Sequence, residues 1–321
     1  MVNSKQQTLK EIVEDTKRTK KKWKIQETRG DKIFLFLVYI YLMIALVITI
    51  YPLIYIISAS ISDPIYVNSG EMILLPMGIT FEGYELIFGN QDIWLGYRNT
   101  IFYTIAGTAV NLIVTIPAAY ALSRPEFYGK KLFTTFLIIT MFISGGMIPS
   151  FILVNNLGLM NTVWAIILPS ATSVFNIIIT RTFFQSNIPR EMEEAAIIDG
   201  CNDFVMFIKI ILPLSLPIVA VMALFFGVGH WNSWFSALIY LSDRSMWPLQ
   251  MFLREILVQQ NMFSMPDIMD GDAAILAHRR QQIAQVIQYG VMIISTLPII
   301  LVYPFLQKYF VKGVMIGSLK G

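Results

Sequence analysis

Six long, uncharged and strongly apolar stretches limit what this chain can fold into. They cover residues 33–57, 101–122, 132–154, 163–180, 214–241 and 286–306. Each approaches or exceeds the roughly 20 residues with which an α-helix crosses a bilayer, and the prolines that they contain are tolerated in membrane helices. With 55% hydrophobic and 14% charged residues, the chain is too apolar for an ordinary soluble domain. The sequence therefore predicts an all-α, polytopic membrane protein with six transmembrane helices.

The lysines and arginines divide the connecting segments into two groups. Of the 24 basic residues, 19 lie in segments 1–32, 123–131, 181–213 and 307–321, and the other five lie in 58–100 and 242–285. Cytoplasmic segments are the ones enriched in Lys and Arg, so we expect both termini to be cytoplasmic. The basic segment 1–32 is expected to rest on anionic membrane lipid, and a nucleic-acid partner is not expected.

The polar segment 186–213 has the pattern of two helices joined by a sharp turn. Pro189 suits the first position of a helix, and three glutamates follow in its first turns, where the helix dipole favours negative charge. Gly200 is expected to end this helix, and Asn202 can cap a second one that runs until Pro213 starts the next span. Periodicity alone also allows an amphipathic helix that lies on the membrane.

The spacing of this segment, EAAIIDGCNDFVMFIKIILP from Glu194 to Pro213, resembles the EAA loop of bacterial ABC-importer permeases. In that family the loop is the cytoplasmic hook that holds an ATPase subunit. The resemblance implies an ATPase-coupling role for a set of residues at the marked positions. This set comprises Glu194, Ala195, Ala196, Asp199, Gly200, Phe204, Ile210, Leu212 and Pro213.

The resemblance covers roughly residues 33–321, which would form one transmembrane permease domain with a type I importer core after the cytoplasmic segment 1–32. The stretches GGMIPSFILVNNLGLMNTVWAIILP, GHWNSWF and YPFLQKYFVKG resemble the carbohydrate-uptake branch, in which relatives of the maltose permease's G-type subunit handle oligosaccharides or polysaccharide fragments. The family implies a bacterial cytoplasmic membrane, a second homologous permease subunit, two cytoplasmic ABC ATPase subunits, an external solute-binding protein and a carbohydrate substrate. ATP and Mg would be bound by the ATPase partners, with no cofactor on this chain.

The sequence offers little chemistry of its own. It has no phosphate-binding loop, one cysteine, two histidines far apart, and an acidic run at 265–272 that lacks calcium-loop spacing. We therefore expect neither catalysis nor a metal site. The six spans contain no acidic residue, which disfavours an ion-coupled carrier as the alternative from another class. A permease for a non-sugar solute such as a peptide is the alternative within the class.

The fifth stretch carries the densest group of polar side chains in the spans. His230, Trp231, Asn232 and Trp234 place aromatic rings beside hydrogen-bonding groups, which suits a sugar in the substrate pathway. The alternative for the tryptophans is the interfacial aromatic belt. Asn176 is a weaker pathway candidate, for which hydrogen bonding between helices is an adequate alternative.

Two further features concern shape and docking. Residues 144–149, SGGMIP, are expected to break or bend the third span. The long external loop 242–285 has the length and location to dock the solute-binding protein.

Overall fold

The computed structural model describes residues 28–263 and 283–304, and the regular elements in these ranges are helices. The predicted all-α fold is therefore confirmed. The chain divides into two compact units, Met1–Ile54 and Tyr55–Gly321, which are considered separately. The segment 1–27, the tail after residue 304 and the acidic run at 265–272 lie outside the described residues.

The described part of the first unit is the beginning of a long apolar helix. Helix α2 runs from Arg29 to Ser60, and its start is fixed by Thr28, whose hydroxyl and backbone N–H both donate to Asp31 Oδ2 at 2.8 Å. Its 32 residues extend about 48 Å, more than the ~30 Å hydrocarbon core of a bilayer. A helix that is apolar on all sides is suited to a membrane.

The second unit contains two more helices long enough to span a membrane and three bent pairs. The long helices are α5, Gln91–Ser123, and the helix Ile283–Pro304. In the first bent pair, α6 (Lys130–Phe142) is followed by α7 (Met147–Asn156). In the second, α8 (Val163–Ile167) and η1 (Leu168–Ser170) are followed by α9 (Val174–Asn187). In the third, the run of α11 (Asp203–Met206), η2 (Phe207–Ile211) and α12 (Leu212–Leu214) is followed by α13 (Leu216–Trp231). Counting each pair as one span gives up to six in the described residues, as predicted.

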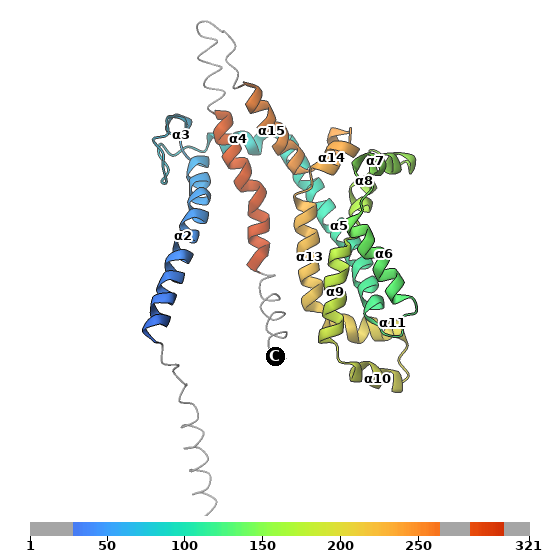
Figure 1. The fold of residues 1–321 in the computed structure, drawn as a ribbon. Helices are drawn as coiled ribbons and strands as arrows, with labels where there is room; N and C mark the ends of the chain where they lie inside the picture. The colour runs from blue at the N-terminus through green and yellow to red at the C-terminus, as the bar shows by residue number, and fades with distance from the viewer. Residues whose placement is uncertain (1–27, 264–282, 305–321) are drawn as a thin grey trace, which may run out of the picture. The chain divides into compact units, whose positions relative to one another are not determined.

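Helix α5 lies at the centre of the second unit, where it packs against α13, α9 and α15 (Leu249–Phe263). Figure 1 shows these helices side by side. Close approach of α5 and α13 requires a glycine, because a Cβ at Gly107 would overlap the imidazole ring of His230. A buried cluster that includes Ile116, Ile177 and Met222 joins α5, α9 and α13.

Three predicted spans are not continuous helices, and one of them, 163–180, bends by 52° between η1 and α9. The stretch 132–154 bends by 113° at the break between α6 and α7, where Gly146 has φ +83°, so the expected break at 144–149 is confirmed. The stretch 214–241 divides into α13 and α14 (Phe235–Tyr240). Asn232 ends α13, because both its backbone N–H and its side-chain amide donate to Val228 O.

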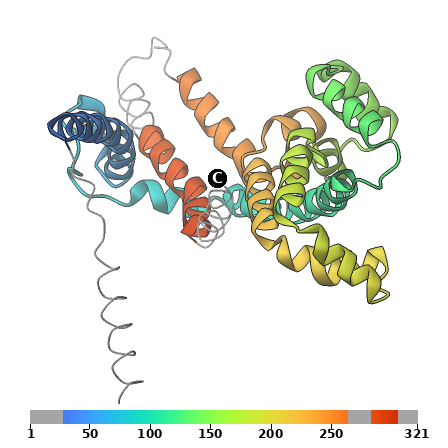
Figure 2. The ribbon, with the colours of Figure 1, turned by 60° about the horizontal axis from the view of Figure 1, so that its bottom comes forward.

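Short helices occupy the two ends of the spans. At one end lie α3 (Pro64–Ser69), α4 (Glu82–Gly89), α7, α14, η3 (Arg244–Met246) and α15. At the opposite end of α9 and α13 lies a hairpin with α10 (Arg190–Ile198) as its first arm and the run from α11 to α12 as its second, and Figures 1 and 2 both show the two arms side by side. The second unit therefore separates the loop expected to dock a binding protein from the loop expected to hold an ATPase.

Candidate coupling hairpin and polar residues of the spans

The turn of the hairpin has the local structure that its sequence predicts. Gly200 adopts φ +77°, and its N–H donates to Ile197 O at 2.9 Å while the N–H of Cys201 donates to Ala196 O at 2.9 Å. This pair of bonds is the Schellman arrangement, which satisfies the last carbonyls of α10. Asn202 then caps the second arm by accepting from Val205 N at 2.9 Å.

The second arm differs from the expectation that Pro213 would start the next span. The arm runs from Asp203 to Leu214 and bends by 79° into α13 at Ser215, so Pro213 lies before the bend. Residues Phe207–Ile211 form a π-helical turn, in which Leu212 N donates to Phe207 O, five residues earlier. This wider turn changes the hydrogen-bond register next to the proline, which has no N–H to donate.

One face of the hairpin is buried against the spans. Ala196, Met206 and Ile211 belong to the same buried cluster as residues of α5, α9 and α13, and Ile210 and Leu212 pack against it. Of the predicted coupling residues, Ala196, with 6% exposure, and the half-buried Ile210 and Leu212 therefore contact this chain's own core. A movement of the hairpin would be passed directly to these three helices because their side chains are close-packed.

The other face of the hairpin is exposed and largely apolar. Ile198 is 85% exposed and Phe204 75%, and Ile197 and Ile208 are also exposed. We call these four residues the hairpin patch. Glu194, Ala195, Asp199, Gly200 and Pro213 of the predicted set are exposed as well. Sequence reasoning included Phe204 but missed the three isoleucines, although their place beside Glu-Ala-Ala and Phe204 on short amphipathic helices was a usable signal.

An ion pair that the sequence did not reveal ties the hairpin to α5. The guanidinium of Arg124, which follows the last residue of α5, pairs with the Glu193 carboxylate of α10, and both side chains are mostly buried. The same guanidinium lies 5.5 Å from the centre of the Tyr120 ring, which is 5.1 Å from the Phe207 ring of the second arm. Arg124 and Tyr120 thus connect α5 to both arms.

His230 and Trp231 use their hydrogen-bonding groups within the protein. Asn111 donates from its amide nitrogen to Ser170 O, so its amide oxygen accepts from His230 Nε2 at 2.7 Å. Trp231 Nε1 donates to Ser295 O at 2.9 Å. Both rings are buried. These bonds join α5 to η1, and α13 to both α5 and the helix Ile283–Pro304.

The other pathway candidates lie in different settings. Asn176 is buried in the first turn of α9, where its backbone N–H is capped by the Ser173 hydroxyl. Asn232 and Trp234 are exposed at the end of α13, and the guanidinium of Arg254 lies 4.9 Å from the centre of the Trp234 ring. Asn232 and Trp234 are therefore the two candidates with accessible side chains.

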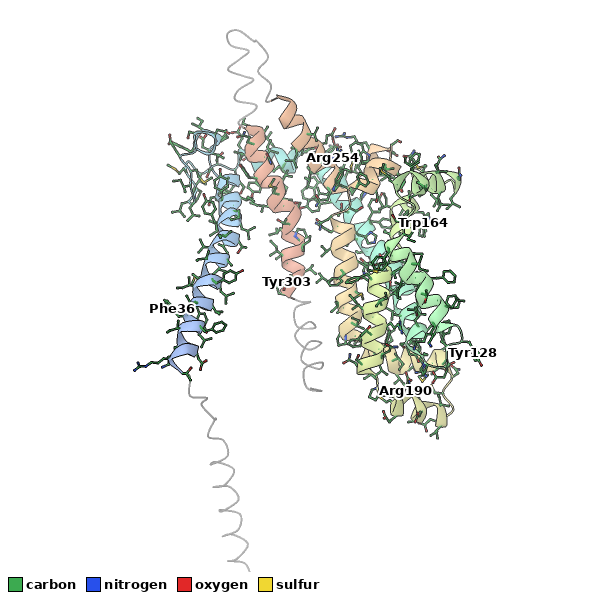
Figure 3. All side chains as sticks on the ribbon, in the orientation of Figure 1. Phe36, Tyr128, Trp164, Arg190, Arg254 and Tyr303 are labelled. Carbon is green, nitrogen blue, oxygen red and sulfur yellow. The ribbon has the colours of Figure 1, made fainter. Side chains whose placement is uncertain are left out.

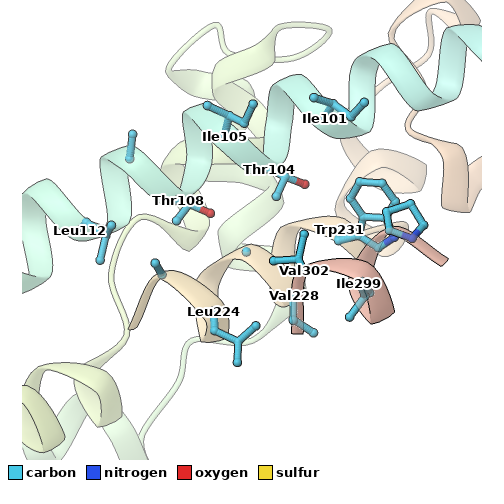
Figure 4. A pocket seen from close by; sticks show the side chains of 14 residues that line it. Ile101, Thr104, Ile105, Thr108, Leu112, Leu224, Val228, Trp231, Ile299 and Val302 are labelled. Atoms are coloured by element: carbon cyan, nitrogen blue, oxygen red, sulfur yellow. The ribbon is translucent and has the colours of Figure 1, made fainter. Parts of the chain in front are cut away.

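A cavity of about 520 Å³ lies between α5, α13 and the helix Ile283–Pro304 (Figure 4). Its lining is apolar apart from Thr104 and Thr108, whose hydroxyls are buried and make no hydrogen bond in the described part of the chain. Trp231 lies at one end of the cavity. Two hydroxyls are few for a sugar, so the chemistry of this cavity favours an apolar group.

A charged clamp holds the elements at the end of the spans opposite the hairpin. Arg244 in η3 pairs with Asp92 of α5 and with Glu255 of α15, each at 2.8 Å, and its guanidinium lies 5.1 Å from the centres of the Trp247 and Phe252 rings. The hydrogen bonds to Glu255 and Asp92 raise the pKa of Arg244, so it stays charged. The clamp holds α15 against α5.

Comparison with known proteins relates this chain to one family of membrane transport components. The model of a family described as "Binding-protein-dependent transport system inner membrane component" matches residues 93–316. The polygalacturonan/rhamnogalacturonan transport system permease protein YtcP of Bacillus subtilis is 40% identical over 91% of this chain and 99% of its own length. Protein LplC of the same species is 42% identical over 85% of this chain and 90% of its own length.

A solved structure shares the fold. It is a chain of a bacterial ABC transporter involved in the import of the acidic polysaccharide alginate. The TM-score is 0.78 with 34% sequence identity, and the match covers 88% of this chain and 98% of that chain.

Proposed function

Because this chain belongs to the binding-protein-dependent transport system inner membrane components, we propose that it forms one half of the translocation pathway of an importer for oligosaccharides. Members of this family are permease subunits of ABC transporters and are not catalytic, since ATP is hydrolysed by partner ATPases. The family further implies a second permease subunit and a solute-binding protein. Among the possibilities that the sequence left open, an ion-coupled carrier has no support from these relatives.

The substrate class follows from the relatives. One relative is named for the transport of polygalacturonan and rhamnogalacturonan, and the solved neighbour for the import of alginate, an acidic polysaccharide. These names are the observation that carries the proposal: the substrate is an oligosaccharide released from a polysaccharide that contains acidic sugars. They also favour a sugar over a peptide, the other solute considered for the same scaffold.

The hairpin patch is the proposed ATPase-docking surface. It exposes four large apolar side chains at one end of the spans, next to Glu194 and Asp199. Exposed apolar groups with a polar rim are typical of a protein–protein contact. The opposite face of the hairpin is packed on α5, α9 and α13 and tied by the Arg124–Glu193 pair. When ATP closes the ATPase dimer, the hairpin would move with it and carry these three helices toward the outward-open state.

Direct contact with the substrate is proposed to be weak. His230 and Trp231 form their hydrogen bonds within this chain, so Asn232 and Trp234 remain the accessible candidates for a transient contact with the substrate. Asn176, which is buried, is a weaker candidate. A substrate that binds equally tightly to the inward-open and outward-open states would not shift the equilibrium between them. Selection of the sugar is therefore assigned to the solute-binding protein, which would dock on the external elements that include α15 and the loop 242–285.

ATP hydrolysis by the assembled complex in lipid tests this function. The complex would be supplied with its binding protein and, in turn, with oligogalacturonides, neutral oligosaccharides of equal length and peptides. We expect stimulation by the acidic oligosaccharides. Stimulation by peptides alone would refute the substrate class. Loss of the ATPase subunits from a complex with Phe204→Ala and Ile198→Ala, but not with Tyr128→Ala, would support docking through the hairpin patch.

A further inference from the structure

Three cations gather near the end of the spans that carries the hairpin. Lys130 is the first residue of α6, Arg181 lies within α9, and Arg190 is the first residue of α10. Lys130 Nζ donates to Ser123 O at 3.3 Å, and Gln185 of α9 donates to the same carbonyl at 3.5 Å. Lys130 therefore lies beside α9, within electrostatic range of Arg181 and Arg190. None of the three cations forms an ion pair within residues 28–263 and 283–304. Like charges held together in this way favour an anion that binds between them.

Arg181 is the most constrained member of this group. It precedes the last residue of α9, Asn187, by six positions, or roughly 9 Å along the helix. Its Nε is buried and finds no hydrogen-bond acceptor in the described part of the chain. Leaving a buried donor unsatisfied destabilises a fold. The acceptors that best match a guanidinium are carboxylates and phosphates.

The neighbouring aromatic residues indicate where the polar surface of the membrane lies. Tyr128 is 98% exposed and stands two positions before Lys130. Figure 3 shows Tyr128 and Arg190 at the same end of α6 and α9. Exposed tyrosines of membrane proteins concentrate at the level of the lipid head groups. The three cations therefore lie at the level at which lipid phosphates are found.

Helix α6 extends from these cations with Leu137 packed against the buried cluster and an apolar face left exposed. None of its residues is buried, and Leu132, Phe133, Phe136 and Phe142 are all more than half exposed. A cationic end followed by the exposed apolar side chains of α6 matches the two parts of a phospholipid, a charged head and acyl chains. An acidic protein surface would match the cations but not this apolar helix.

We propose that Lys130, Arg181 and Arg190 bind the phosphate group of an anionic phospholipid whose acyl chains lie along α6. The lipid would supply the acceptor that Arg181 Nε lacks and would hold α6, α9 and the first residue of α10 together. This places part of the lipid contact on α10, the helix that also carries Ile197 and Ile198 of the hairpin patch. Assignment of the lipid to the cytoplasmic leaflet rests on the proposed orientation, whereas the binding itself does not.

Native mass spectrometry of the assembled complex in an uncharged detergent can test this site. The complex is titrated with phosphatidylglycerol, and the affinity of the retained lipid is measured for the wild type and for single variants. Each of Lys130→Gln, Arg181→Gln and Arg190→Gln should weaken binding about fivefold, the size expected for one basic residue at a membrane surface. Lys131→Gln is the matched control, because it removes the same charge from the next residue of α6, and it should leave the affinity unchanged.

Several results would overturn the proposal. Equal weakening by Lys131→Gln would show a diffuse charge effect, and equal retention of phosphatidylcholine would show that no anionic head group is selected. Displacement of the lipid by millimolar inorganic phosphate would assign the site to a free anion. Unchanged lipid affinity together with loss of the ATPase subunits in Arg190→Gln would assign the cations to the ATPase. Arg190 is exposed at the start of α10, so its variant should assemble even if Arg181→Gln does not.

Discussion

At the scale of single residues, Gly200 decides whether the hairpin can turn. Its φ of +77° is not available to proline, and its N–H bonds to Ile197 O. Gly200→Pro should therefore disrupt the turn and release the ATPase subunits, with loss of uptake. Co-purification of the ATPase with a normally inserted variant measures this effect. Cys201→Ser, a change of one atom at the next position, is the control, and retention of the ATPase by Gly200→Pro at the wild-type level would contradict the docking role.

Substitutions of two adjacent glutamates are expected to have different effects, one on the stability of the permease and the other on ATPase docking. Glu193 is paired with Arg124 and mostly buried, whereas Glu194 is exposed. Glu193→Gln should destabilise the attachment of the hairpin by about 1.5–3 kcal/mol, the usual contribution of a hydrogen bond to a charged group. Glu194→Lys should leave the melting temperature of the permease unchanged and weaken ATPase retention. Thermal unfolding and co-purification distinguish the two, and equal melting temperatures for both variants would refute the structural role of Glu193.

At the scale of elements, the contact between α5 and α13 depends on one missing side chain. A Cβ at Gly107 would overlap the ring of His230, which bonds to Asn111 on the same helix α5. Gly107→Ala should therefore push α13 away and destabilise the protein by about 1–3 kcal/mol, as overpacking of a core usually does. Gly229→Ala is the matched control, since its Cβ would meet nothing within 4 Å. Similar melting temperatures for the two alanine variants would contradict this packing.

The bend between α6 and α7 is a second property of elements. Gly146 has φ +83° at the break, a conformation that residues with side chains rarely adopt. Residues 144–149 signalled a break in the sequence, but the angle of 113° follows from how α7 packs through Val154 against Ala165 and Tyr240. The position of the break is thus encoded locally in the sequence, whereas the angle between α6 and α7 depends on tertiary packing.

At the scale of the whole molecule, the orientation in the membrane remains a prediction that labelling can test. In a Cys201→Ser background, cysteines at positions 5 and 318 should react with impermeant reagents only after lysis, and one at position 261 should react in intact cells. The distribution of 19 of the 24 basic residues is the physical reason. Labelling of position 318 from outside would refute a cytoplasmic C-terminus.

Local and compositional signals in the sequence determined the class of protein, the six apolar stretches and the turn at Gly200. These follow from the length of uncharged runs compared with the bilayer and from backbone preferences of single residues. The family also followed from the spacing of the hairpin. Such features depend on neighbours within a few residues, and they could therefore be read without a fold.

Only the tertiary structure decided which side chains meet. The Arg124–Glu193 pair, the bond between Asn111 and His230, and the cations Lys130 and Arg181 all join residues that are far apart in the sequence. The same is true of which hairpin face is buried and which is left as the hairpin patch. Short amphipathic helices allow either face to be covered, and the choice is made by packing against α5, α9 and α13, which no local pattern encodes.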